Sequence, residues 1–463
     1  MATFITLTAT STSTNQVKPI YLPSLQILTL LCFIGLARLL QASARDAACD
    51  SLGRHPPSKC HPGTRLDIIE TLEGWITNTA KPGVFWLHGP AGAGKSAIAQ
   101  TICELSAERN HLLASFFFMR GSPDRGTIRN FIPTLASQIG TSRPDVRQYI
   151  GNAMNADLTI IHRSTSTQLL KLVIEPLRST LLPQSAPFLV VVDGLDECEG
   201  KDHQLQILSH ISELATKYHL TVRFLIVSRP EPHIKHFFDV SLNQNVSIAF
   251  SIYGHGTEYG DVYQFLRSKF DEISVSERHT STLAYVNKPW PSDDIVQHLA
   301  WKSDGYFIYA STLLKYIDDE YSPCTKRLQE VLQAAGPNST AFAELDKLYT
   351  QILSTCPNIQ LLSRALGCLI VLPTYRLIQG PWTIERVLEL WPGEGMTILR
   401  GLHAVLNIKR GIITPIHASL SDFLFDKSRS SKFYVDPQIC HVDIIFYSLW
   451  SITHWGQKEG DRK

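Results

Sequence analysis

Short apolar runs alternate with longer segments of helical periodicity between residues 81 and 235. The four runs are GVFWLHG, LLASFFF, PFLVVVDG and VRFLIVS, and each is rich in β-branched or aromatic residues. Continuous apolar runs separated by helical segments are typical of parallel strands that are buried on both faces. The pattern predicts an α/β fold with a doubly wound parallel sheet over residues 81–239.

The pattern changes to helices after about residue 240. We expect an all-α helical domain over residues 240–345, followed by a winged-helix domain over residues 346–435 that closes on the alternating piece GIITPIHASLSDFLF. Residues 45–80 are expected to lead into the sheet as helix, loop and helix. Residues 436–463 are too few to make another domain and are expected to form a tail.

The N-terminal segment 1–44 contains no Asp or Glu, and residues 19–37 carry no charge. Residues 19–37 suit an amphipathic or partner-binding helix, a membrane anchor, or a targeting peptide or mistaken gene start. Pro19, Pro23 and Gln26 weaken the membrane interpretation. The nine cysteines are scattered without a CxxC pair, which fits a reducing compartment. We therefore expect a cytoplasmic protein, with membrane contact through residues 19–37 as an open alternative.

The composition argues against one class of protein, namely nucleic-acid binders that are held by their overall charge. A formal net charge of +1, with 18% charged residues, places the chain among soluble globular proteins. Bulk charge of this size does not hold a protein on nucleic acid, although a local basic patch is compatible with it.

The stretch GPAGAGKS, Gly89 to Ser96, matches the phosphate-loop pattern GxxxxGK[ST] in full. Its glycines let successive backbone N–H groups point into one concavity, Lys95 reaches the β- and γ-phosphates, and Ser96 ligates Mg²⁺. A predicted strand precedes the stretch and a predicted helix follows it, as the motif requires. The predicted nucleotide contacts here are Gly89, Pro90, Ala91, Gly92, Ala93, Gly94, Lys95, Ser96 and Ala97.

A second motif, FLVVVDGLDEC, is a buried strand that ends in acidic residues. Because parallel strands end at the same edge of a sheet, we expect Asp193 beside the phosphate loop, where it would hold Mg²⁺ together with Ser96. Asp196 and Glu197 are placed to position the attacking water, and with Lys95 they form the predicted catalytic set. Arg229, which follows the strand VRFLIVS, either senses the γ-phosphate or is a surface arginine beside a turn.

The order and spacing of GPAGAGKS, VVVDGLDEC and IVSRP resemble the NACHT domains of STAND-type signalling NTPases, in particular the fungal and nephrocystin-like proteins. The phrases ASFFFMRG, RNFIPTLASQI and CHPGTRLDII also resemble that subgroup. The resemblance implies that the cofactors are ATP or ADP with Mg²⁺. It covers residues 45–240 most closely and continues more weakly to about 435.

The resemblance also implies further nucleotide contacts. Arg65, in HPGTR, would hold the adenine end. Gly305 occupies the position of a Gly-Leu-Pro helix start, where this chain has Tyr306 and Phe307 instead of Leu-Pro. His417 stands where relatives hold the β-phosphate of ADP, with a satisfied core histidine as the alternative.

The function implied is a signalling switch that is closed with ADP, opens and self-associates with ATP, and is reset by slow hydrolysis. An unknown effector or sensor protein is the expected partner, because relatives carry such domains on both sides; the chain is then a short form or a truncated gene model. Two alternatives are a structural scaffold with a vestigial site and an ATP-dependent winged-helix nucleic-acid binder. No nucleic-acid partner is expected, because residues 381–426 carry five acidic and four basic residues.

Overall fold

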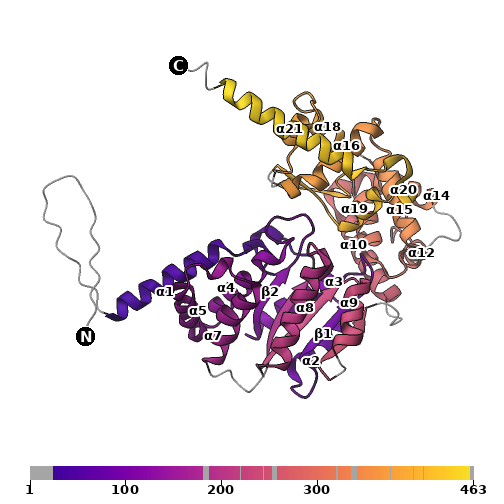
Figure 1. The fold of residues 1–463 in the computed structure, drawn as a ribbon. Coiled ribbons are helices and arrows are strands. Elements are labelled where there is room, and N and C mark those ends of the chain that lie inside the picture. The colour runs from indigo at the N-terminus through magenta and orange to yellow at the C-terminus, as the bar shows by residue number, and fades with distance from the viewer. Residues whose placement is uncertain are drawn as a thin grey trace, which may run out of the picture.

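The structure of the protein is a computed structural model (Figure 1). It describes residues 24–180, 187–218, 220–242, 245–252, 258–319, 322–334, 341–375, 377–399, 401–409 and 411–458.

A parallel sheet of five strands forms the centre of the N-terminal part (Figure 1). The strands are β1 (Val84–His88), β2 (Leu112–Phe117), β3 (Phe188–Asp193), β4 (Val222–Ser228) and β5 (Ser247–Ser251). Their order in the sheet is β2-β3-β4-β1-β5, and each neighbouring pair is parallel. All five strands therefore end at the same edge of the sheet, where β1, β3 and β4 deliver the phosphate loop, Asp193 and Arg229.

Helices cover both faces of this sheet. Alternate residues of β1 show the two sides, because Phe85 and Leu87 belong to one buried cluster, whereas Val84 and Trp86 belong to another. Helices α2 (Leu66–Thr77) and α3 (Lys95–Glu108) pack on the first side, and α4 (Phe131–Ser142) and α8 (Lys201–Thr216) pack on the second. The prediction of an α/β fold with a doubly wound parallel sheet is confirmed.

Strand β5 lies beyond the predicted boundary at residue 239. It pairs with β1 from Val84↔Ser247 to His88↔Ser251, so the sheet extends past that boundary. The sequence SIAFS escaped prediction because an edge strand with only part of its surface buried lacks the continuous apolar run of the central strands.

Helix α1 (Ser24–Gln41) belongs to the α/β part of the molecule. It packs against α5 (Pro144–Ala156) and α4, and Leu39 is fully buried. A Cβ on Gly35 would lie 2.6 Å from the carbonyl oxygen of Gly151, so the two helices approach closely through small residues. The expected partner-binding helix thus has a partner within its own chain.

The membrane interpretation concerned residues 19–37. Residues 19–23 lie outside the described residues. None of the helices in the described parts of the chain has the length and apolarity that crossing a bilayer requires. The helix that was predicted to begin residues 45–80 is replaced by two short 3-10 turns, Arg45–Ala47 and Leu52–Arg54, before α2.

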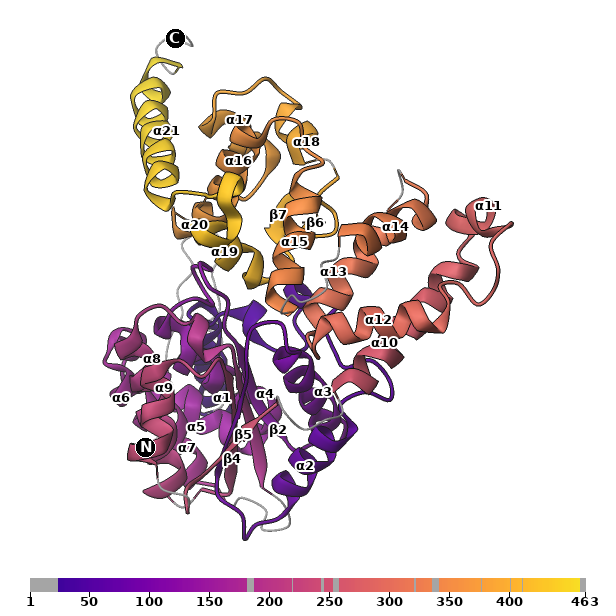
Figure 2. The same ribbon diagram turned by 90° about the vertical axis from the view of Figure 1, so that its right-hand side faces the viewer.

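The described residues from 258 onward form helices and a hairpin around a continuous core that runs from Val262 to Ile444. The main helices are α10 (Glu258–Val275), α12 (Asp293–Ser303), α13 (Phe307–Ile317), α14 (Cys324–Ala334), α15 (Ala341–Leu353), α16 (Ile359–Val371), α17 (Pro381–Val387), α18 (Glu394–Leu399), α19 (Ala418–Phe425), α20 (Lys427–Ser430) and α21 (Pro437–Lys458). Because α15 crosses the predicted boundary between 345 and 346, the two predicted domains are parts of one packed unit. Figure 2 shows α15 and α19 where this unit meets the α/β part.

The last part of the chain has helices followed by a hairpin, but the predicted alternating piece GIITPIHASLSDFLF is only half right: it supplies one strand, Ile412–Pro415, and its second half is helix α19 (Ala418–Phe425). Strands β6 (Leu406–Lys409) and β7 (Ile412–Pro415) are antiparallel and follow α16, α17 and α18. The designation of this region as a winged helix stays a prediction. The expected tail is helix α21, whose Cys440 and Ile444 are buried against the preceding helices.

Candidate nucleotide site

The phosphate loop connects β1 to α3. Gly92 and Gly94 have φ values of +76° and +92°, in the left-handed region that other residues rarely adopt. A Cβ on Gly92 would also lie 2.0 Å from Cγ2 of Ile308, in the first turn of α13. Glycine is therefore needed at position 92 for its backbone conformation and for the close approach of α13.

Lys95 begins α3, and its ammonium lies against the loop. Its Nζ donates hydrogen bonds to the carbonyl oxygens of Gly89 (2.9 Å) and Pro90 (2.8 Å). Burial lowers the pKa of Lys95, and the negative charges of Asp196 and Asp193 oppose that shift. Lys95 therefore has two carboxylates nearby, and it would have to exchange the loop carbonyls for phosphate oxygens in order to bind a nucleotide.

Asp193 ends β3 beside Ser96, which hydrogen-bonds to its carboxylate. Its side chain is buried, and among the described residues its Oδ1 has no hydrogen-bond partner. Burial raises the pKa of Asp193 to about 6, while Ser96 and the charges of Arg54 and Lys95 act to lower it. A buried carboxylate oxygen without a partner favours a bound cation.

These groups fit Mg²⁺. Mg²⁺ takes hard oxygen ligands, commonly one or two from the protein together with phosphate oxygens and water. The Ser96 hydroxyl and the Asp193 carboxylate supply two such oxygens at the phosphate loop. The described residues contain no group of three or more His, Cys, Asp and Glu side chains that could hold a metal by themselves, so a cation here would depend on a nucleotide.

Asp196 and Glu197 lie in a short 3-10 turn after β3 and have different environments. Asp196 accepts a hydrogen bond from the backbone N–H of Arg229 (2.9 Å), and its other oxygen lies 3.3 Å from Arg229 Nε. Within the described part of the chain, the hydrogen bond that Glu197 accepts comes from the backbone N–H of Arg120 (3.1 Å). Burial, followed by the charge of Asp196, raises the pKa of Glu197 to about 7. A carboxyl group with a pKa near neutrality suits a general base, which makes Glu197 the better candidate for that role.

Arg229 joins the α/β part to the C-terminal unit. Its Nη1 lies 2.8 Å from Asp422 Oδ2, and Asp422 is on helix α19. The other oxygen of Asp422 lies 3.1 Å from Nη1 of Arg120. Asp422 thus contacts two arginines that also bind Asp196 and Glu197. Arg229 is 20% exposed and paired with both Asp196 and Asp422, and its contact with a γ-phosphate stays a prediction.

His417 caps the N-terminus of α19. Its Nδ1 accepts the backbone N–H of Ser419 (3.0 Å) and lies 2.8 Å from the hydroxyl of the same residue, which in turn contacts the Tyr349 hydroxyl (2.8 Å). Burial lowers the pKa of His417 to about 4, and the positive charges of Arg229 and Lys95 contribute. The ring is therefore neutral, with its proton on Nε2, near both cationic residues of the phosphate site.

Arg65 is buried and joins three elements. Its Nη2 donates to the carbonyl oxygens of Ala93 (3.0 Å) and Gly305 (3.4 Å), and its guanidinium lies 5.1 Å from the ring centre of Phe307. Its Nε lies 3.7 Å from Asp261 Oδ2. The structure therefore brings together Arg65 and Gly305, which the resemblance assigned to the adenine end, and places Arg65 against Ala93 of the phosphate loop. In this arrangement Arg65 connects the phosphate loop to the segment that leads into α13.

Sequence reasoning missed Arg120 and Asp422. Arg120 follows the end of β2, and a general expectation that parallel strands deliver functional residues at their carboxyl ends could have found it. Asp422 has no such signal, because its role depends on how α19 packs against the α/β part.

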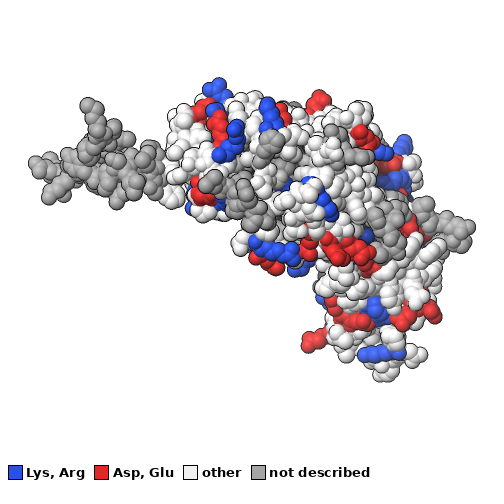
Figure 3. All heavy atoms as spheres, turned by 90° about the horizontal axis from the view of Figure 1, so that it is seen from below, with Lys and Arg blue, Asp and Glu red and all other residues white. Residues whose placement is uncertain are grey.

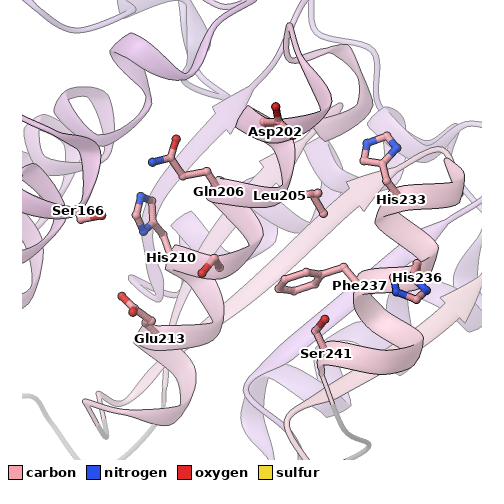
Figure 4. Close-up of a pocket in the computed structure, with 11 residues that line it drawn as sticks. Ser166, Asp202, Leu205, Gln206, His210, Glu213, His233, His236, Phe237 and Ser241 are labelled. Carbon is pink, nitrogen blue, oxygen red and sulfur yellow. The ribbon is translucent and has the colours of Figure 1, made fainter.

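One cavity lies away from the phosphate loop (Figure 4). It has a volume of about 580 Å³ and lies between α8 and the segment 233–241. Its lining includes His210, Glu213, His233 and Phe237. None of the predicted nucleotide contacts lines it.

The sequence matches the family model for the N-terminal region of nephrocystin 3 over residues 63–229. That segment contains the phosphate loop and ends at Arg229. No curated protein matches the sequence.

Three solved structures illustrate the structural likeness. Drosophila ORC bound to DNA shares 13% identity and a TM-score of 0.38, covering 75% of this chain and 88% of that one. Cdc6p from Pyrobaculum aerophilum shares 15% identity and a TM-score of 0.35, covering 77% and 91%. The ADP form of the Aeropyrum pernix ORC2 protein shares 12% identity and a TM-score of 0.33, covering 85% and 96%.

Proposed function

We propose that the protein is an ATP- and ADP-binding, Mg²⁺-dependent switch in which the nucleotide controls the contact between the α/β part and the C-terminal unit. One observation carries the proposal. Asp422 of α19 is paired with Arg229, and Arg229 is paired with Asp196 beside the phosphate loop. One of the contacts between the two parts is therefore made by an arginine that lies near Lys95.

The charge of the γ-phosphate provides the switching force. A bound γ-phosphate would bring a concentrated negative charge beside Lys95, and it would compete with Asp422 for Arg229. ADP lacks that phosphate, so Arg229 keeps its bond to Asp422 and α19 stays docked. ATP weakens the bond and favours an open arrangement. A differential interaction of this kind is what a ligand needs in order to shift a conformational equilibrium.

Hydrolysis resets the switch slowly. Glu197 is the candidate base, and Asp196 orients Arg229. Mg²⁺, held by Ser96 and Asp193, would supply charge stabilisation on the phosphates. The neutral His417 offers Nε2–H as a donor for a phosphate oxygen of ADP in the closed form.

The cellular role follows the resemblance to NACHT signalling proteins. The open form would self-associate and act on an effector or sensor protein. This part of the proposal is supported by the motifs of the chain and by the position of α19 at the junction between the two parts.

Nucleotide-dependent size is the decisive experiment. The full chain would be mixed with Mg²⁺ and either ADP or a non-hydrolysable ATP analogue; affinity would be measured by calorimetry and mass by light scattering. We expect both nucleotides to bind and only the analogue to produce larger species. Absence of binding would favour the scaffold alternative, and binding of both without any difference in mass or shape would contradict the switch.

The nucleic-acid alternative is tested in the same preparation. On the face shown in Figure 3, acidic and basic side chains are interspersed and form no extended basic surface. We expect no salt-dependent binding of duplex DNA with either nucleotide, and such binding would instead support the winged-helix nucleic-acid binder.

A further inference from the structure

Two cysteines from separate segments meet beside the phosphate-loop helix. Cys49 lies in the segment between α1 and α2, and Cys103 lies on α3. Their thiols are hydrogen-bonded to each other, and neither residue is in a disulfide. Cys103 is fully buried, whereas Cys49 is 7% exposed and is followed by the exposed Asp50. Cys49 is therefore the less buried residue of the pair.

Hydrogen bonds to the backbone of Cys49 fix its position next to α3. The N–H of Cys49 donates to the Ser115 hydroxyl (2.9 Å), and its carbonyl accepts from Nε2 of Gln100 (3.1 Å). Gln100 and Cys103 are one turn apart on α3, so the same helix fixes the carbonyl of Cys49 and presents the second thiol. The two sulfur atoms are thus kept near each other by a rigid framework.

The surrounding charges favour a nucleophilic sulfur at Cys49. The Arg54 guanidinium lies 3.4 Å from the ring centre of Phe117, donates to Gln100 Oε1 (3.0 Å) and interacts electrostatically with both sulfur atoms. The hydrogen bond from Cys103 lowers the pKa of Cys49 to about 7, against the opposing effect of burial. Burial raises the pKa of Cys103. Cys49 is therefore the attacking sulfur and Cys103 the resolving one.

We propose that Cys49 and Cys103 are a peroxide-sensitive thiol pair that closes to a reversible disulfide. The Cys49 thiolate attacks one oxygen of hydrogen peroxide, the O–O bond breaks, and a sulfenic acid and hydroxide form. The sulfur of Cys103 then attacks the Cys49 sulfur, its proton joins the departing hydroxyl, and water leaves. Two thiols are oxidised to one disulfide, and one peroxide is reduced to two waters. A dithiol reductant reverses the bond.

The disulfide would fasten the segment between α1 and α2 to the helix that begins with Lys95 and Ser96. The bond closes a long loop of chain, which restricts the unfolded state and raises the melting temperature. The proposal does not depend on the switching function, because it concerns thiol chemistry that is measurable without nucleotide.

Peptide mapping tests the pair directly. The full chain would be treated with hydrogen peroxide, alkylated in denaturant with N-ethylmaleimide and digested with trypsin without reduction. Cleavage after Arg45, Arg54, Lys95 and Arg109 gives DAACDSLGR, which contains Cys49, and SAIAQTICELSAER, which contains Cys103. We expect these two peptides to appear linked, two hydrogen atoms lighter than their sum, and to separate after reduction. The inference is overturned if both cysteines remain alkylated, or if Cys49 is oxidised to sulfinic acid without a linked peptide.

Two variants sharpen the test. In C103A the resolving thiol is missing, so we expect dimedone to trap a sulfenic acid at Cys49. In C60S, a half-buried thiol of the same segment is removed and the Cys49–Cys103 link should form as in the wild type. Loss of the link in C60S would contradict the assignment. The wild-type map stands even if one variant folds poorly.

Discussion

The Asp422 carboxylate on α19 lies 2.8 Å from the Arg229 guanidinium at the end of β4, and this ion pair joins the C-terminal unit to the predicted phosphate site. Asp422 and Arg229 are 23% and 20% exposed, so water screens the pair only in part. In the proposed switch, this pair would transmit a change of charge at the nucleotide to the position of α19.

Replacing Asp422 by Asn should favour the open form. The variant keeps the size of the side chain but loses the charge that holds Arg229 and Arg120. We expect the ratio of ATP-analogue affinity to ADP affinity, measured by calorimetry, to rise about 5- to 50-fold over the wild type. D346N is the matched control, because Asp346 pairs with Arg429 (2.7 Å) within the C-terminal unit. An equal change in both variants would mean that the effect is one of general stability.

Asp193→Asn should remove the dependence of nucleotide binding on Mg²⁺. The amide lacks the negative oxygen that we expect to attract the cation. In the wild type, EDTA should weaken ATP-analogue binding at least about tenfold, whereas in the variant binding should be weak with and without Mg²⁺. D202N, at an exposed carboxylate in the first turn of α8, is the control and should keep the wild-type response. Full Mg²⁺ dependence in D193N would refute the assigned site.

The sequence predicted those parts of the site that depend on short, local motifs. The phosphate loop, Asp193 and the acidic turn follow from motifs that the surrounding strands and helices support, and strands β1 to β4 follow from continuous apolar runs. The edge strand β5, the packing of α1 on α5 and the role of Asp422 could not be predicted. Each of these features depends on which surfaces meet after folding, and the residue pattern within one segment does not determine this.

The raised pKa of Glu197 leads us to expect that increasing pH raises the hydrolysis rate and lowers the stability of the fold. As a base it must lose its proton, so the hydrolysis rate should rise as pH increases through about 7 and should level off above it. Glu197→Gln should lower the rate at least about 100-fold and remove this rise.

The same carboxyl group affects stability. Its pKa is raised on folding, so the native state binds the proton more tightly and stability falls as pH increases from about 4.5 to about 7. E197Q should therefore have a higher melting temperature than the wild type at pH 8 and little advantage at pH 4.5. Equal melting temperatures of the two proteins at both pH values would contradict the raised pKa.

Arg65→Ala should weaken the connection between the phosphate loop and α13. The change removes the bonds to Ala93 and Gly305 and the ion pair to Asp261, which is itself only 12% exposed. We expect a loss of about 3 kcal/mol in the free energy of unfolding by denaturant. R109A breaks the exposed pair with Glu73 and should change stability by less than about 1 kcal/mol. Similar losses of unfolding free energy in both variants would mean that Arg65 does not connect the phosphate loop to α13.

Hydrogen exchange of α19 tests the central claim most directly. The backbone amides of residues 418–425 would be followed in the full chain with Mg²⁺ and saturating ADP, and again with a saturating non-hydrolysable ATP analogue. We predict faster exchange with the ATP analogue, because the γ-phosphate takes Arg229 from Asp422 and α19 undocks; D422N should exchange fast with either nucleotide. Equal protection of α19 in both nucleotide states, with binding confirmed for each, would contradict the account.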